Sequence, residues 1–285
     1  MMTIRERAPA KINLTLDVLT KRADGYHDLE SIMQAVSLED EIILEIGTGE
    51  PWELVCSRKG IPTDERNIAW KAAKVFYDTV SADPNGLRIT VIKTIPSEAG
   101  LGGGSADGAA VLRGLNRTLE HPFSLMELAE MGAKVGSDVP FCVIGGTAYC
   151  EGRGERLTPL NIEPKYSYVL CKPDLAFSTP KLFGKLDNSV ITRRPDHKAM
   201  ISELERGNAE AVGTLLCNVF EEAVLDEYES IKRIKTLLLE QGALGAQMTG
   251  SGSVVFGIFA TEEQAVSGAE AIKQEFPNTF ACKTV

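Results

Sequence analysis

The chain is poor in the residues and segments that mark several large protein classes. It has three histidines in 285 residues, too few for a dedicated metal cluster. Its six cysteines are scattered without a Cys-x-x-Cys pair, which indicates buried, reduced thiols. No apolar run approaches the ~18–20 residues that span a bilayer, and the first residues lack the apolar core of a signal peptide. We therefore expect a cytosolic protein without a membrane segment.

Basic residues are also in deficit. The 30 lysines and arginines face 40 aspartates and glutamates, for a formal net charge of −10. Such a surface repels nucleic-acid phosphates, and no basic stripe interrupts it, so we expect no nucleic-acid partner. Hydrophobic residues make up 44% and charged residues 25%, as in globular proteins, and the length leaves room for two ordinary domains. A small anionic ligand would depend on backbone amides and a few cations.

The most informative stretch is Pro96–Asp107, Pro-Ser-Glu-Ala-Gly-Leu-Gly-Gly-Gly-Ser-Ala-Asp. It follows a strand-like segment, Leu87–Ile92, and opens into a helix-like one, Ser105–Leu119. The apolar stripe of that helix is Ala109, Ala110, Leu112, Leu115 and Leu119. Exposed glycine amides and the positive end of a helix dipole both favour phosphate. A P-loop has a Lys-Ser/Thr pair after its last glycine, whereas Ser105-Ala106 stands there in this sequence. The glycines from Gly100 onward also lack the spacing of a dinucleotide-binding motif. We predict a nucleoside triphosphate loop; a flexible linker, the alternative, rarely lies between a strand and a helix.

Period-two alternation marks a strand over Ala10–Leu19. Its apolar set is Ile12, Leu14, Leu16 and Val18, and its polar set is Lys11, Asn13, Thr15 and Asp17. Alternation places each set on one face, so Lys11 and Asn13 project side by side. Taken alone, this polar set is best interpreted as an ordinary solvated strand face.

A turn separates this strand from a second one expected at Glu41–Ile46. The segment Arg22–Asp28 carries Asp24-Gly25, which is typical of a turn corner. The Tyr26-His27 pair beside it is either an exposed hairpin tip or a stacking and hydrogen-bonding edge for a ligand ring. The residues of this segment alone favour the hairpin tip.

Several helix boundaries are marked by capping residues. Asn67 is expected to cap a helix that runs through Tyr77, and Ser124-Leu-Met-Glu127 is a capping box for a helix over Leu125–Lys134. Ser178-Thr-Pro180 opens a short helix through Leu186, and residues 226–241 read as another helix. Further strands are expected over Tyr168–Cys171 and Val254–Phe259, with a helix starting at Thr261.

Two short segments have more than one interpretation. Asp138 lies in Gly136-Ser-Asp-Val-Pro140 and precedes an apolar run. It is either a turn or cap aspartate or a carboxylate at the rim of a buried segment that acts as a general base. Taken alone, the Gly250-Ser-Gly252 segment indicates a hairpin or a bulge. If it lies beside the first glycine loop, it would cover a phosphate bound there.

Residues Pro96–Ala106 resemble the ATP loop of the GHMP kinase superfamily, which includes galactokinase, homoserine kinase and mevalonate kinase. Further segments are similar to a member of this superfamily that phosphorylates a cytidine diphosphate polyol. These are Ala8–Leu14, Asp24–His27 and Gly136–Pro140, and the resemblance ends with Met248–Gly252. The resemblance covers essentially the whole chain.

The resemblance implies an α+β fold of two domains. Residues 1–160 would form an N-terminal ribosomal-protein-S5-like α/β domain with the ATP loop and the catalytic residues. Residues 161–285 would form a C-terminal ferredoxin-like domain. Substrate and ATP would meet in a cleft between the two, a usual location for small-molecule sites.

The implied reaction is ATP-dependent phosphorylation of the 2-hydroxyl of the polyol, in the non-mevalonate isoprenoid pathway, with Mg²⁺. By the same match Asp138 is the general base, and Lys11 stabilises both that carboxylate and the developing alkoxide. Asn13 would orient the polyol. The cytidine end would be lined by Tyr26, His27, Thr179 and Phe183. The ATP loop comprises Pro96, Ser97, Glu98, Ala99, Gly100, Leu101, Gly102, Gly103, Gly104, Ser105 and Ala106.

Two positions of the loop differ from the usual ATP-loop sequence of the family that the chain resembles. Ala106 stands where a second serine is usual, so Ser105 is the remaining hydroxyl and one candidate metal ligand. Glu98 is expected to point outward, because a carboxylate facing phosphate weakens binding. The alternatives are a superfamily kinase acting on homoserine or mevalonate, and a non-catalytic nucleotide-binding sensor. Oligomeric state is not predicted.

Overall fold

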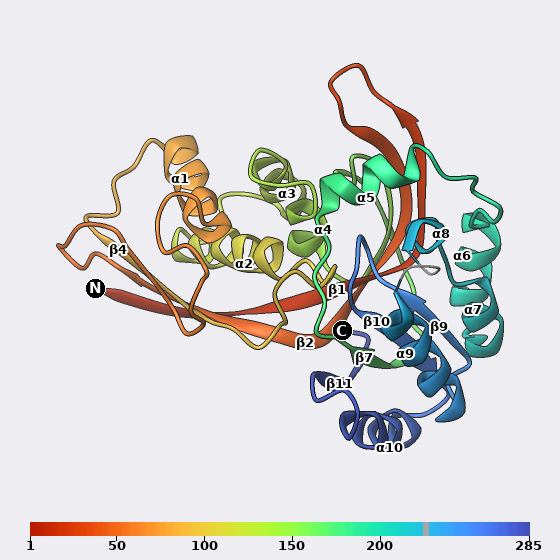
Figure 1. Cartoon of the computed structure of the whole chain (residues 1–285). Helices are drawn as coiled ribbons and strands as arrows, with labels where there is room; N and C mark the ends of the chain where they lie inside the picture. The colour runs from red at the N-terminus through yellow and green to blue at the C-terminus, as the bar shows by residue number, and fades with distance from the viewer. Residues whose placement is uncertain (225–227) are drawn as a thin grey trace. The chain divides into compact units, whose positions relative to one another are not determined.

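The computed structural model describes residues 1–224 and 228–285, and Figure 1 shows the order of its strands and helices. The strands are β1 (Met2–Lys21), β2 (His27–Ile46), β3 (Glu53–Cys56), β4 (Leu87–Ile92), β5 (Thr147–Gly152), β6 (Arg156–Leu160), β7 (Ser167–Cys171), β8 (Cys217–Asn218), β9 (Gly245–Met248), β10 (Val255–Phe259) and β11 (Thr279–Lys283). The helices are α1 (Ile68–Val80), α2 (Gly103–Thr118), α3 (Leu125–Ala133), α4 (Val139–Ile144), α5 (Thr179–Leu186), α6 (His197–Arg206), α7 (Ala209–Leu215), α8 (Phe220–Val224), α9 (Glu229–Glu240) and α10 (Glu262–Lys273).

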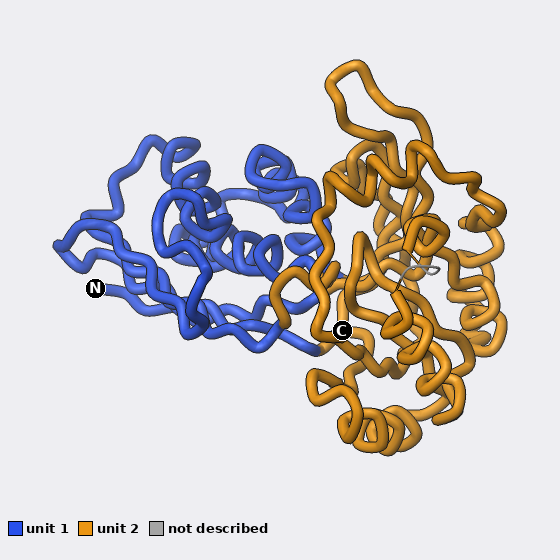
Figure 2. The backbone as a smooth tube through the Cα atoms, in the orientation of Figure 1, with its two compact units in different colours: residues 1–10, 38–95, 102–145 blue, residues 11–37, 96–101, 146–285 orange. Residues whose placement is uncertain are grey.

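The chain divides into two compact units, coloured separately in Figure 2. Unit 1 contains residues 1–10, 38–95 and 102–145, and unit 2 contains residues 11–37, 96–101 and 146–285. The long strands β1 and β2 contribute residues to both units. This division differs from the two continuous domains expected from the sequence, 1–160 and 161–285. The expected domain boundary at residue 160 stays a prediction.

Unit 1 packs helices α1 to α4 beside a small set of strands. Strand β4 pairs antiparallel with the second half of β2 and parallel with β3. Helix α2 lies directly on the strands, because a Cβ on Gly114 would come 2.7 Å from the side chain of Leu44. The caps form as expected: Asn67 accepts a hydrogen bond from the amide of Ala69 at 2.9 Å, and Ser124 and Glu127 form a capping box.

Unit 2 contains a four-stranded antiparallel sheet in the order β11-β7-β10-β9. Helix α9 precedes β9 and helix α10 precedes β11, and both helices pack on this sheet. A β-α-β-β-α-β order of this kind is ferredoxin-like, as expected. Helix α9 starts at Glu229, and residues 226–227 of its expected range lie outside the described residues. Its core side chains are Ile231, Ile234 and Leu238.

Several element boundaries were predicted wrongly. Strand β1 begins at Met2, eight residues before the expected Ala10, and helix α1 ends at Val80 rather than Tyr77. Helix α2 begins at Gly103 rather than Ser105, because its N-cap Gly102 has a φ of +68° and turns the chain into the helix two residues earlier. The helix ends at Thr118, which leaves Leu119 at its C-cap and 45% exposed instead of in the apolar stripe. Strand β2 begins at His27, fourteen residues before the expected Glu41, because its first half is buried on both faces and does not alternate cleanly.

Two further observations concern the helices and the cysteines. Among residues 1–224 and 228–285, no helix combines the length and the apolar character that crossing a membrane requires. All six cysteines are free thiols, and five of them are buried, in agreement with the expectation of reduced cysteines.

Candidate active site

Strand β1 carries a buried row of polar side chains. Lys11, Asn13, Thr15 and Asp17 are between 0% and 5% exposed, so the expectation of a solvated face was wrong. Segments distant in sequence cover them: Thr15 Oγ1 hydrogen-bonds His197 Nδ1 at 2.9 Å, and Asp17 pairs with Arg194. Buried polar groups are tolerated only when they are paired in this way.

Lys11 and Asn13 lie side by side, as the alternation predicted. Lys11 Nζ donates to Asn13 Oδ1 at 2.7 Å, and Asn13 Nδ2 donates to Ser31 Oγ at 2.8 Å. Because an ammonium group can only donate, these contacts fix the amide of Asn13 with its oxygen toward Lys11. A lysine and an amide in this arrangement can bind the oxygens of a phosphate or a polyol.

The first half of the glycine loop belongs to unit 2 and is fixed there by its backbone. The amide of Lys11 donates to the carbonyl of Leu101 at 3.0 Å, and the amide of Val254 donates to the carbonyl of Ala99 at 3.2 Å. Gly100 approaches the second glycine turn so closely that a Cβ would lie 2.2 Å from the carbonyl oxygen of Thr249. The two glycine segments therefore touch. Glu98 is exposed, as expected.

The second half of the loop belongs to unit 1 and forms the start of α2. Gly102 caps the helix with its backbone alone, which leaves the first-turn amides open to a ligand at the positive end of the dipole. Gly104 is exposed and Ser105 half-buried. Ala106 is 1% exposed, so a hydroxyl at this position would lie in the interior of the unit.

Asp138 occupies the N-cap position of α4, also in unit 1. The amide of Cys142 donates to its backbone carbonyl at 3.1 Å, whereas its side chain makes no capping hydrogen bond. Asp138 as a residue is half-buried. The cap interpretation therefore holds for the backbone of Asp138 and does not account for its side chain.

The predicted cytidine-binding residues lie in unit 2. His27 is 8% exposed, and its ring stacks on Phe183 with centroids 4.8 Å apart at 18°. His27 Nε2 hydrogen-bonds Asp187 Oδ1 at 2.7 Å. Hydrogen bonds from Lys21 and then His27 lower the pKa of Asp187 below its usual value. Asp187 was not among the residues predicted from the sequence.

Tyr26 and Thr179 are placed differently from the stacked pair. Tyr26 is 58% exposed, and the guanidinium of Arg153 lies 5.1 Å from its ring centroid, consistent with a hairpin tip. Thr179 Oγ1 hydrogen-bonds Ser251 Oγ at 2.9 Å, which links the start of α5 to the second glycine turn.

A buried charge cluster lies at the base of the glycine loop in unit 1. Lys93 Nζ binds Asp107 Oδ2 at 2.7 Å and also pairs with Asp40, and all three side chains are at most 5% exposed. Asp40 additionally accepts hydrogen bonds from the amides of Thr94 and Ile95. Burial raises the pKa of Asp107 to about 7; Lys93 opposes this shift and Asp40 reinforces it. The cluster ties the end of β4 to the first turns of α2.

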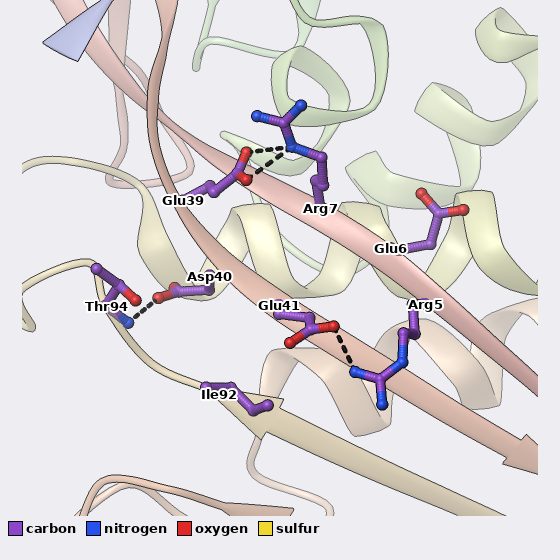
Figure 3. Close-up of a pocket in the computed structure, with 8 residues that line it drawn as sticks. All are labelled: Arg5, Glu6, Arg7, Glu39, Asp40, Glu41, Ile92 and Thr94. Carbon is purple, nitrogen blue, oxygen red and sulfur yellow. Dashed lines mark hydrogen bonds and ion pairs between the residues drawn. The ribbon is translucent and has the colours of Figure 1, made fainter.

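A separate cavity of about 340 Å³ lies in unit 1 (Figure 3). Its charged walls neutralise one another: Arg5 pairs with Glu41, and Arg7 pairs with Glu39. None of the predicted site residues lines it. We assign no function to this cavity.

Comparison with known proteins identifies the class. The sequence family described as GHMP kinases N terminal domain matches residues 67–146, and GHMP kinases C terminal matches residues 200–278. A crystal structure of 4-(cytidine 5'-diphospho)-2C-methyl-D-erythritol kinase matches with a TM-score of 0.82 and 30% identity, over 99% of both chains. The protein is therefore a GHMP kinase, and the expected α+β fold is confirmed.

Curated relatives narrow the class further. The 4-diphosphocytidyl-2-C-methyl-D-erythritol kinase of Caldicellulosiruptor saccharolyticus is 45% identical over 267 residues, which cover 94% of this chain and 92% of the relative. The Clostridium tetani kinase of the same name is 41% identical over 279 residues, covering 98% and 99%. The chain belongs to the family of 4-diphosphocytidyl-2-C-methyl-D-erythritol kinases. A homoserine kinase from Cytophaga hutchinsonii, with a TM-score of 0.78 at 19% identity, shares the fold.

Proposed function

We propose that this chain transfers the γ-phosphate of ATP to the 2-hydroxyl of 4-diphosphocytidyl-2-C-methyl-D-erythritol. The observation that carries the proposal is the near full-length identity of 45% to a curated kinase of that name. The stacked His27–Phe183 pair favours a substrate with a ring, which homoserine and mevalonate lack. The six free cysteines support work in the reducing cytosol.

The proposed nucleotide site is the glycine loop, Pro96–Ala106. Its open first-turn amides on α2 would bind phosphate oxygens. Within the described residues, no group of three or more His, Cys, Asp or Glu side chains is placed to hold a metal ion. In this proposal Mg²⁺ would arrive on the nucleotide phosphates, with Ser105 as one protein ligand, because Mg²⁺ keeps waters and phosphates in its shell. Bound there, Mg²⁺ would neutralise charge on the phosphates.

The proposed catalytic residues are Asp138 and Lys11. Asp138 would accept the proton of the attacking 2-hydroxyl, a role for which the carboxylate of a half-buried residue at the start of α4 is suited. Lys11, buried and held by Asn13, would stabilise negative charge on the reacting oxygens. Asn13 would orient the polyol, and Tyr26, His27, Thr179 and Phe183 would bind the cytidine end.

The decisive substitution is Asp138→Asn, which keeps the shape and removes the base. We expect kcat to fall about 10²- to 10⁴-fold, while ATP binding changes little. Asp78→Asn, an exposed substitution on α1, is the matched control and should keep full activity. Retention of more than about a tenth of the wild-type rate in Asp138→Asn would contradict the base assignment.

A substrate panel tests the acceptor. The wild-type chain is assayed for ADP release with the cytidine polyol, homoserine and mevalonate. We expect turnover with the first compound alone. Equal turnover with homoserine or mevalonate would favour another superfamily kinase, and no turnover with any of them would favour a non-catalytic nucleotide-binding sensor.

A further inference from the structure

The hydroxyl of Thr249 lies at the centre of a buried network in unit 2. Thr249 follows β9 and is 0% exposed. Its Oγ1 accepts a hydrogen bond from the backbone amide of Asn13 at 2.9 Å and lies 3.3 Å from the side-chain oxygen of that residue, Oδ1. Gly100 O is a second possible acceptor at 3.5 Å. Because a hydroxyl has one proton, the shorter contact, to Asn13 Oδ1, is the better hydrogen bond.

Asn13 passes this constraint on to Lys11. The same Oδ1 that faces Thr249 accepts the hydrogen bond from Lys11 Nζ at 2.7 Å. The other side of the amide donates to Ser31, whose hydroxyl in turn donates to the carbonyl of Thr15 at 2.6 Å. Every polar atom of the Asn13 side chain thus has a partner, and Thr249 is the partner that comes from the second glycine turn.

The backbone of Thr249 is itself fixed on both sides. Asn218, 3% exposed, donates through Nδ2 to the carbonyls of Met248 at 2.8 Å and Gly250 at 2.9 Å. Gln247 donates to the carbonyl of Asn13 at 3.1 Å. The hydroxyl of Thr249 is therefore held in place before any ligand binds, as a preorganised group must be.

We propose that Thr249 is a positioning residue that orients Lys11 through Asn13. A lysine ammonium ends a flexible chain of four carbons, so its placement depends on a fixed acceptor. Asn13 provides that acceptor, and Thr249 holds it in place. The inference rests on the role proposed above for Lys11. The proposed role of Thr249 is separate from the turn formed by the glycines of Met248–Gly252 and from phosphate binding.

The test compares Thr249→Val with Thr249→Ser. Valine replaces the hydroxyl by a methyl group of similar size, whereas serine keeps the hydroxyl. We expect Thr249→Val to lower kcat about 10- to 100-fold with little change in the KM for ATP, since misplacing a catalytic group acts on the chemical step. Thr249→Ser should retain most of the wild-type kcat. Equal loss in both variants, or none in Thr249→Val, overturns the proposal.

A double-mutant cycle with Lys11→Met separates positioning from general damage. If Thr249 acts through Lys11, adding Thr249→Val to Lys11→Met should change kcat by less than about twofold, because coupled sites are not additive. The same fold loss in both backgrounds overturns the proposal. Slow turnover is measured at high enzyme concentration.

Folding and the proposed function are checked separately. Each variant's melting temperature is measured, and if Thr249→Val does not fold, Thr249→Ala is compared with Thr249→Ser by the same two criteria. A wild-type chain that does not phosphorylate the cytidine polyol would refute the proposed function. An active wild-type chain with an equally active Thr249→Val variant refutes this inference alone.

Discussion

The carboxylate of Asp187 orients the ring of His27. It holds Nε2 of the imidazole at 2.7 Å, which leaves Nδ1 as the nitrogen that faces other partners. We expect Asp187→Ala to raise the KM for the cytidine substrate about 3- to 10-fold, the worth of one hydrogen bond, with kcat nearly unchanged. Steady-state kinetics at saturating ATP measure both constants.

Lys21→Met is the matched control for this prediction. Lys21 Nζ donates to the other carboxylate oxygen of Asp187, Oδ2, at 2.7 Å. Within the described part of the chain it makes no hydrogen bond to His27. Its removal leaves the His27–Asp187 hydrogen bond in place, so the KM should change less than in Asp187→Ala. A fall in kcat with an unchanged KM in Asp187→Ala would show that Asp187 does not serve substrate binding.

From the sequence, it was easier to predict which side chains lie beside each other on a strand than whether those side chains are buried. Period-two alternation placed Lys11 beside Asn13, and the structure confirms the pair. Their burial was not predictable from the strand, because the covering groups, Thr249 and the turn around it, lie more than 200 positions away. Asp187 was missed for the same reason: only tertiary packing brings the end of α5 to the start of β2.

The contact between the two glycine segments depends on Gly100. Its φ is +76°, and a Cβ would lie 2.2 Å from the carbonyl oxygen of Thr249, a backbone atom that cannot swing away. We expect Gly100→Ala to lower the free energy of unfolding by more than the ~1–2 kcal/mol that a left-handed backbone conformation costs an L-residue, and to weaken ATP binding. Thermal unfolding and titration with a non-hydrolysable ATP analogue measure the two effects.

Gly60→Ala separates strain from collision. Gly60 has a φ of +84° with open space around the position of a Cβ, so alanine there meets backbone strain alone. The melting temperature of Gly100→Ala should therefore fall further than that of Gly60→Ala. Equal shifts would mean that the loop moves aside and that the contact with Thr249 is not needed.

Helices and strands were predicted where local chemistry sets their ends. The Ser124–Glu127 capping box and the Asn67 cap fixed the starts of α3 and α1 to the residue, because a cap is a contact between near neighbours. The start of α2 was missed, since glycines carry no side chain to signal a cap. The early start of β2 was missed because burial on both faces removes the alternating pattern.

The fold and the chemical class were predictable from four ordered motifs, and their confirmation came from the family relationship. The pairing order β11-β7-β10-β9 was not predictable from local patterns, because strand order is set by side-chain packing between distant segments. The buried Lys93 cluster was missed likewise: its three charged side chains come from β2, the residue after β4, and α2.

That cluster makes the stability of the entire protein depend on pH. One cation, Lys93, faces two buried carboxylates, and Asp40 has backbone amides as further donors. Asp107 Oδ1 has no hydrogen-bond partner among residues 1–224 and 228–285, so Asp107 is the carboxyl that keeps a proton. Its pKa rises from 3.8 to about 7. Between these values the folded chain binds a proton that the unfolded chain has released, so the free energy of unfolding falls as pH rises from about 4 to about 7, by up to about 1.4 kcal/mol per pH unit.

Asp107→Asn tests this dependence, because an amide cannot ionise. The free energy of unfolding, measured by urea titration from pH 4 to pH 8, should fall less steeply with pH in Asp107→Asn than in the wild-type chain. The two curves should lie closest near pH 4, where Asp107 is protonated in the folded state. Asp64→Asn is the control: the hydrogen bonds from Arg66 lower the pKa of this exposed carboxyl to about 2, so its contribution changes below pH 4, and the slope above that pH should equal the wild-type slope. Parallel curves for Asp107→Asn and the wild-type chain would show that Asp107 is ionised throughout this range and that Lys93 neutralises it.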